Sequence, residues 1–128
     1  MFQNNEYFVC DKVKIVIDEA IKEADAIVFG WPIYYYEITG QSRVWLDRTF
    51  SMVGENFAPR HPGKKVITIF TQGNLDHKIG TEGIKYVTNI FELYGWKLED
   101  SIHFCGTSDP DLETFEELSL RAFKGGKT

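Results

Sequence analysis

The sequence lacks the features that mark nucleic-acid-binding and membrane-spanning proteins. Its 128 residues carry a formal net charge of -5, and Lys and Arg are scattered rather than clustered, so no basic stripe can neutralise a phosphate backbone. The longest uncharged apolar run, Ala26 to Tyr36, is far shorter than the roughly 20 residues that a helix needs to cross a bilayer. We therefore expect neither nucleic acid nor a membrane as a partner.

Cysteine is also scarce, and histidine offers little more. Cys10 and Cys105 lie far apart and no signal peptide precedes them, so we expect ordinary reduced thiols and a cytoplasmic location. His61, His77 and His103 show no metal-ligand spacing, and each is expected at the surface or satisfied by a hydrogen bond. The sequence predicts no metal site.

What the sequence does have is a strict alternation of helical and strand patterns, with no repeat and no linker that would divide residues 1–128 into more than one domain. Strands alternating with helices of this length predict an α/β fold with a parallel sheet, right-handed crossovers and helices on both faces. In order, we expect a helix from Asp11 to Ala24, a strand from Ala26 that Pro32 ends, a helix opened by Thr39 and Gly40 that carries Phe50, a loop from Gly54 to Gly63, a strand over 64–71, a helix ending at Gly95, a strand over 96–104 and a last helix from near Pro110.

The loops that follow the strands carry most of the chemistry. In open parallel sheets, ligands bind beyond the carboxyl ends of the strands. The first loop there combines aromatic rings with exposed main-chain amides, and the second is polar and contains glycine. A flat heteroaromatic ligand would fit such loops, although the aromatic run could equally cap the core or form a subunit interface, and the second loop could be a plain turn. The candidate binding residues are Pro32, Ile33, Tyr34, Tyr35, Tyr36, Thr71, Gln72, Gly73 and Asn74.

The stretch ADAIVFGWPIYYYEITGQSRVWLDR resembles the third-strand region of flavodoxin-like FMN-dependent NAD(P)H oxidoreductases, which include multimeric flavodoxins, iron-sulfur flavoproteins and NADPH-dependent FMN reductases. Trp31 departs from the family pattern, which has Ser or Thr there, and so do the three consecutive tyrosines. The segments GKKVITIFTQGN and FELYGWKLED are similar to the family's next strand and to its following helix-to-strand junction. The matching positions of the first stretch are Gly30, Pro32, Tyr34, Gly40, Gln41, Asp47 and Arg48.

The resemblance implies a flavodoxin-like doubly wound parallel sheet, of which this chain would be the C-terminal two-thirds. The family's first strand and its phosphate-binding loop have no counterpart in residues 1–10, and neither has the cysteine cluster of the iron-sulfur relatives. We therefore expect no iron-sulfur centre. We expect this chain alone to bind FMN weakly or not at all, and a version restored with the upstream segment to bind FMN tightly and to reduce it with NAD(P)H. The family's sheet order would also leave the apolar edge from Ala26 to Gly30 beside the missing strand, and we expect that edge to be covered.

The resemblance further implies hydride transfer from NAD(P)H to FMN and delivery to a quinone or similar acceptor, in a homo-oligomer. The main chain of Ile33 to Tyr35 would lie near the reactive ring edge, the tyrosines beside the ring, and Thr71 to Asn74 along another edge. Because the flavin supplies the chemistry, no catalytic acid or base is predicted. We expect Asp47 and Arg48 to form a structural ion pair or to cap their helix.

Two other classes of function stay open at this point. One is a flavodoxin-type electron carrier, which a dense acidic rim would favour, and Glu37 and Asp76 are few for such a rim. The other is a flavin-free structural or interaction module. A phosphoacceptor receiver domain shares the architecture, but it needs a Lys after its last strand, and FCGTSDP has none.

Overall fold

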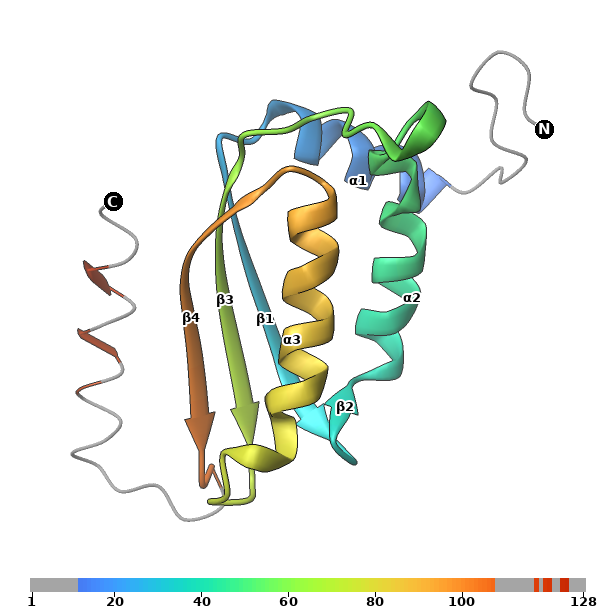
Figure 1. The fold of residues 1–128 in the computed structure, drawn as a ribbon. Helices are drawn as coiled ribbons and strands as arrows, with labels where there is room; N and C mark the ends of the chain where they lie inside the picture. Colours follow the sequence, from blue (N-terminus) through green and yellow to red (C-terminus); the bar gives the residue numbers. More distant parts are fainter. Residues whose placement is uncertain (1–11, 108–116, 118, 121–122, 125–128) are drawn as a thin grey trace.

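The sheet has four strands in the order β2-β1-β3-β4, in a computed structural model that describes residues 12–107, 117, 119–120 and 123–124. β1 (Ala26–Tyr34), β3 (Lys65–Gln72) and β4 (Lys97–Cys105) are parallel, and the short β2 (Glu37–Ile38) returns antiparallel to the end of β1. Figure 1 shows the three long strands pointing the same way. The predicted α/β class with a parallel sheet is confirmed.

The helices alternate with the strands as the sequence pattern predicts. α1 (Lys12–Glu23) precedes β1, α2 (Gly40–Arg48) follows β2, and α3 (Lys78–Leu93) connects β3 to β4. α2 and α3 lie over the same face of the sheet (Figure 1). Two short 3₁₀ helices, η2 (Thr49–Met52) and η3 (Glu55–Phe57), lie between α2 and β3. Asp11 and nearly all of the helix predicted from Pro110 lie outside the described residues.

Local sequence fixes where α2 begins and where α3 stops. The Thr39 hydroxyl accepts a hydrogen bond from the main-chain N–H of Ser42 at 3.2 Å, which makes Thr39 the N-cap of α2. At the other helix, Gly95 adopts a φ of 71°, a left-handed conformation that glycine reaches without strain. A Cβ at Gly95 would stand 2.9 Å from Pro62 Cβ, so the close packing of that loop requires glycine as well. Both signals are confirmed.

The prediction that Pro32 ends the first strand is wrong, because β1 continues through Pro32 to Tyr34. Proline cannot donate to a ladder, and strands tolerate it where its nitrogen needs no partner. Pro32 pairs in register with Thr71 of β3, and on the outer side of β1 the pairing with β2 starts only at Ile33. β2 itself was not predicted, and Phe50 belongs to η2 rather than to α2.

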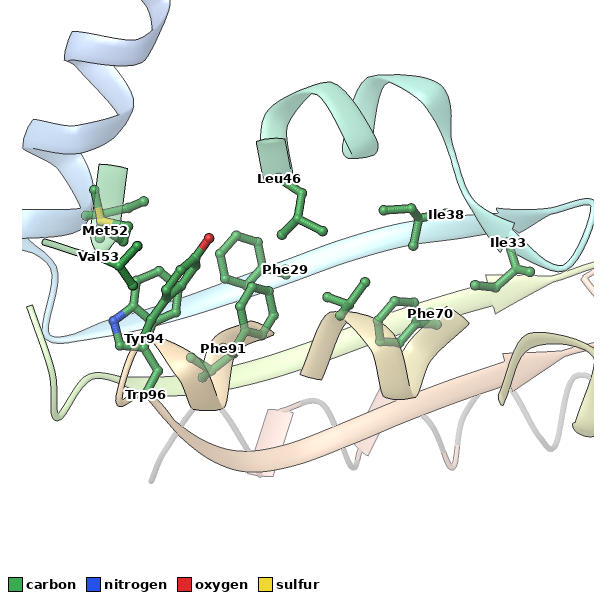
Figure 2. Close-up of a cluster of buried hydrophobic side chains, with 13 residues drawn as sticks. Phe29, Ile33, Ile38, Leu46, Met52, Val53, Phe70, Phe91, Tyr94 and Trp96 are labelled. Atoms are coloured by element: carbon green, nitrogen blue, oxygen red, sulfur yellow. The ribbon is translucent and has the colours of Figure 1, made fainter. Parts of the chain in front are cut away.

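An aromatic layer under α2 and α3 forms the core. Phe29 lies at its centre, with ring centroids 4.6 Å from Phe91 and from Trp45 and 5.2 Å from Trp31. Close packing of this kind fixes α3 against the sheet. Figure 2 shows the cluster between the helices and the strands; its buried members are Ile21, Phe29, Ile33, Ile38, Leu46, Met52, Val53, Val66, Phe70, Val87, Phe91, Tyr94 and Trp96.

The outer edge of β1 has only partial pairing within the described residues. β2 pairs with Ile33 and Tyr34, while Ala26 to Gly30 pair with β3 on their inner side. Val28, whose side chain points to the face away from Phe29, is 62% exposed. The expectation that this edge is covered therefore stays a prediction. Within the described part of the chain, no helix has the length and apolar character needed to cross a bilayer.

We predict that Phe91→Ala lowers the free energy of unfolding by about 3–5 kcal/mol, because it leaves a cavity at the centre of the aromatic layer. Phe91 is 1% exposed, whereas Leu93 on the same helix is 45% exposed and serves as the matched control. Leu93→Ala should cost less than about 1 kcal/mol. Urea unfolding followed by circular dichroism measures both, and equal losses would contradict this core.

Candidate functional site

The two candidate loops meet at one end of the sheet. Pro32 and Thr71 are register partners in the β1–β3 pair, so β1, which ends at Tyr34, and β3, which ends at Gln72, leave the sheet at the same end. Gln72 pairs in turn with Cys105, which brings the end of β4 to the same place. The predicted convergence of these loops is confirmed, and Figure 1 shows the strand ends that carry them.

The tyrosine run forms a tight hairpin turn. Tyr34 pairs with Glu37, so Tyr35 and Tyr36 are the connecting residues, and both have positive φ angles, 48° and 72°. Such two-residue turns strongly favour Asn and Gly, because other residues incur strain at positive φ. The three tyrosines are nevertheless exposed, Tyr35 by 95% and the other two by 63% each. Because strained backbone clusters at functional sites, the turn is a candidate binding surface.

Neighbouring residues of the first loop face inward instead. Ile33 is 6% exposed and belongs to the core, so its side chain is not available to a ligand. Trp31 is half-buried and stacks on Phe29, with Phe70 at 5.8 Å on the neighbouring strand. Trp31, which stands where the family pattern has Ser or Thr, therefore contributes its ring to the aromatic core under α3.

The second loop is held by one buried amide. Gln72 is 4% exposed, and its Nε2 donates to the carbonyl oxygens of Asn74 and Asp76, both at 2.8 Å. Asn74 also accepts a hydrogen bond from the Asp76 N–H through its own side chain. Gly73 and Asn74 are exposed, and Thr71 is half-buried. The side chain of Gln72 thus shapes the loop, and Gly73 and Asn74 form its outer surface.

A cluster that the sequence analysis missed lies beside this loop. His77, the residue before α3, and His103 and Cys105 of β4 bring one ligand atom each to within 4.8 Å of one another. The missed signal is the alternation in a strand, because His103 and Cys105 are two residues apart and so point to one face. His77 then reaches that face from the loop, a proximity that sequence spacing cannot reveal.

Burial sets the protonation of this cluster. Partial burial lowers the pKa of His103 below its ordinary value, and the neighbouring His77 lowers it further. Burial also raises the pKa of the Cys105 thiol, and the negative charge of Asp76 raises this pKa further. At neutral pH the cluster therefore holds a neutral His103 imidazole and a protonated thiol.

The last two residues of the family motif, Asp47 and Arg48, lie at the end of α2. Asp47 forms an ion pair with Arg43, which lies one helical turn earlier, with Oδ1 and Nε 3.3 Å apart. Both side chains are exposed, so this ion pair contributes little to stability. Arg48 accepts a hydrogen bond from Ser51 through its main-chain oxygen.

An open hollow of about 610 Å³ lies between α1 and α2 and is lined by Ile17, Gly40, Gln41, Val44, Trp45 and Arg48. Among the described residues that line it, none belongs to the two candidate loops.

Comparison with known proteins places the fold in context. A family model described as the flavodoxin-like fold matches residues 4–124. The ribosyldihydronicotinamide dehydrogenase [quinone] of Mus musculus is 26% identical over 93 residues, which cover 67% of this chain and 39% of that protein. The protein of the same name from Rattus norvegicus is 27% identical over 96 residues, with the same coverage. The chain thus spans about two-fifths of the length of these curated relatives.

Solved structures support the same fold at lower identity. An NADPH-quinone reductase from P. pentosaceus has a TM-score of 0.70 at 13% identity, covering 89% of this chain and 74% of the other. An FMN-dependent NADH-azoreductase from Bacillus anthracis, solved with FMN, has a TM-score of 0.64 at 15% identity, covering 94% and 68%. At this identity, the similarity establishes a shared fold.

The strain in the tyrosine turn is measurable. We predict that the double variant Tyr35→Asn/Tyr36→Gly raises the free energy of unfolding by about 1–3 kcal/mol, because these residues suit positive φ at both positions. Tyr34→Asn is the matched control, since Tyr34 lies in β1 and is 63% exposed but is not among the positive-φ residues. Chemical denaturation measures both. A double variant no more stable than the parent would show that the turn stores no strain.

Proposed function

Because this chain belongs to the flavodoxin-like fold family, we propose that it functions as an FMN-dependent NAD(P)H oxidoreductase that passes electrons to a quinone or similar acceptor. The observation that carries the proposal is the meeting of the exposed tyrosine turn with the Thr71–Asn74 loop at the carboxyl ends of β1 and β3. Relatives named ribosyldihydronicotinamide dehydrogenase [quinone] support the same class, as do structural neighbours named NADPH-quinone reductase and FMN-dependent NADH-azoreductase.

The residues at this end of the sheet fit a flat heteroaromatic ring. Exposed tyrosine rings offer faces on which such a ring can stack, and Gly73 lets a ligand approach the main chain closely. Asn74 adds an amide that can bind polar atoms on the ring edge. The rigid frame that Gln72 gives the loop keeps these groups in place without a ligand.

FMN bound here would supply the hydride chemistry, and the protein's part would be to position and shield it. The main chain at Ile33 to Tyr35 would hold the reactive edge of the ring, while the tyrosine side chains limit the access of water to it. Thr71, Gly73 and Asn74 would orient another edge. No side chain of the site needs to act as a general acid or base in this scheme.

The experiment that tests the proposal measures flavin binding and turnover together. Purified chain is titrated with FMN and with riboflavin, and quenching of flavin fluorescence reports binding; oxidation of NADH and of NADPH is then followed with a quinone as acceptor. Binding with turnover supports the oxidoreductase, and binding without NAD(P)H oxidation supports an electron carrier. The absence of flavin binding in a folded chain supports a structural module. Riboflavin separates ring binding from binding of the phosphate, for which the sequence shows no dedicated loop.

We predict that Tyr34→Ala weakens flavin binding about ten-fold, because base-like rings stacked on an aromatic side chain gain about 1–3 kcal/mol. Tyr34 is chosen since it lies in β1, outside the strained turn. Phe50→Ala is the matched control: Phe50 is 60% exposed, compared with 63% for Tyr34, and lies in η2 at the opposite end of the sheet (Figure 1). Equal effects of the two substitutions on the dissociation constant would contradict this location.

A further inference from the structure

The cluster of His77, His103 and Cys105 joins three segments of the chain at one point. Cys105 Sγ lies 3.4 Å from His77 Nδ1 and 3.6 Å from His103 Nε2. The two imidazole rings meet edge to face, with centroids 5.5 Å apart. One thiol and two imidazoles therefore converge, which is a combination of ligands typical of zinc proteins.

The distances match those that a tetrahedral metal ion requires. Zinc binds imidazole nitrogen at about 2.0–2.1 Å and thiolate sulfur at about 2.3 Å, which places such ligand atoms about 3.3–3.6 Å from one another. Both sulfur-to-nitrogen distances in the cluster agree with this spacing. The third pair, the ligand nitrogens of His77 and His103, lies within 4.8 Å, so small side-chain rotations would complete the geometry.

We propose that His77, His103 and Cys105 form a zinc-binding site, with an oxygen from Gln72 or from water as the fourth ligand. Gln72 Oε1 lies 2.7 Å from His103 Nε2. Because Gln72 Nε2 donates to two main-chain carbonyls, its oxygen is fixed toward the histidine. When Nε2 of His103 binds the metal, its proton moves to Nδ1, and Gln72 Oε1 is released to face the ion or a bound water.

α3 packs closely against one side of the cluster, and the other side can be reached from solvent. A Cβ on Gly80 would stand 2.8 Å from Gln72 Oε1 and 3.2 Å from His103 Nε2, so glycine lets α3 approach this pair. His77 is exposed, and the other two ligands are partly buried, which opens one side of the cluster to solvent. Binding converts the Cys105 thiol to a thiolate and so releases a proton.

The consequence of binding would be structural. A metal held by His77 and by His103 and Cys105 would tie the start of α3 to the end of β4 and would close the loop formed by residues 73–77. That loop contains Gly73 and Asn74 of the proposed ring-binding surface. The zinc site does not depend on the flavin proposal, however, because His77, His103 and Cys105 are not among the residues proposed to bind the ring.

Cobalt is the probe for this site, because tetrahedral Co²⁺ with a thiolate ligand gives intense visible bands and a sulfur-to-metal charge-transfer band. Untagged, reduced full chain is titrated with Co²⁺ without flavin, and Zn²⁺ is then added as competitor. We expect one equivalent of Co²⁺, a thiolate band and displacement by Zn²⁺. Zn²⁺ should also raise the thermal midpoint of the chain.

Single-ligand variants decide whether this cluster is the site. Cys105→Ser should abolish the charge-transfer band, and His77→Asn and His103→Asn should each weaken binding at least about 100-fold. The matched controls are His61→Asn, which changes the third histidine of the chain, and Cys10→Ser, which changes the other cysteine; both should bind as the parent does. Circular dichroism of each variant without metal confirms that it is folded.

Three results would overturn the proposal. They are octahedral Co²⁺ spectra without a thiolate band in the parent chain, unchanged affinity in a folded Cys105→Ser variant, and equal loss of binding in His61→Asn. Should Cys105→Ser fail to fold, the His77→Asn variant decides, since His77 is exposed and its replacement leaves the buried core intact. Loss of flavin binding with intact metal binding would refute only the proposed function.

Discussion

The parallel pairing of β1 with β3 is the constraint on which the rest of the structure depends. Seven register pairs, from Ala26 with Lys65 to Pro32 with Thr71, align the two strands along their length. The same alignment places Trp31 beside Phe70 and so builds the aromatic layer under α3. Because parallel strands end at the same edge, it also brings together the two loops with the most chemistry.

Packing and function are linked at the tyrosine turn. The turn occurs because β2 doubles back to pair with Ile33 and Tyr34, and Gly83 of α3 permits close contact with the main-chain oxygen of Tyr36, at 3.0 Å from the position of a Cβ. The sheet and α3 together hold Tyr35 and Tyr36 at positive φ angles, which are unfavourable for tyrosine. The exposed rings are therefore placed by the core, and the cost of positive φ is offset by packing on both sides.

Periodicity predicted most of the fold, because helices and buried strands leave repeating patterns in the sequence. Apolar spacing predicted α1, β3, β4 and the end of α3, and Thr39 and Gly95 act as the cap residues predicted. The start of α3 was missed, because Lys78 to Gly80 belong to the helix and not to the loop before it. Pro32 misled because its effect depends on whether the neighbouring edge is paired, which is a property of the sheet. β2 left no pattern, since a strand of two residues is too short to show alternation.

The candidate site was only partly predictable for a similar reason. The candidate segments that begin at Pro32 and Thr71 were identified because they follow strands in the sequence pattern. In the structure, the side chains of Ile33 and Gln72 are buried and do not face a ligand at the surface. The cluster of His77, His103 and Cys105 is formed by tertiary contacts between segments that are separated by a whole helix. Sequence spacing could therefore place Cys105 beside His103 and could not add His77.

The central claim is that a flavin ring binds where the tyrosine turn meets the Thr71–Asn74 loop. Riboflavin titrated into isotopically labelled chain, followed by amide chemical shifts, tests it most directly. The account predicts that the largest changes fall on Tyr34 to Tyr36 and on Gly73 and Asn74. Changes confined to the hollow between α1 and α2, around Gln41 and Val44, would place the ligand elsewhere and contradict the account.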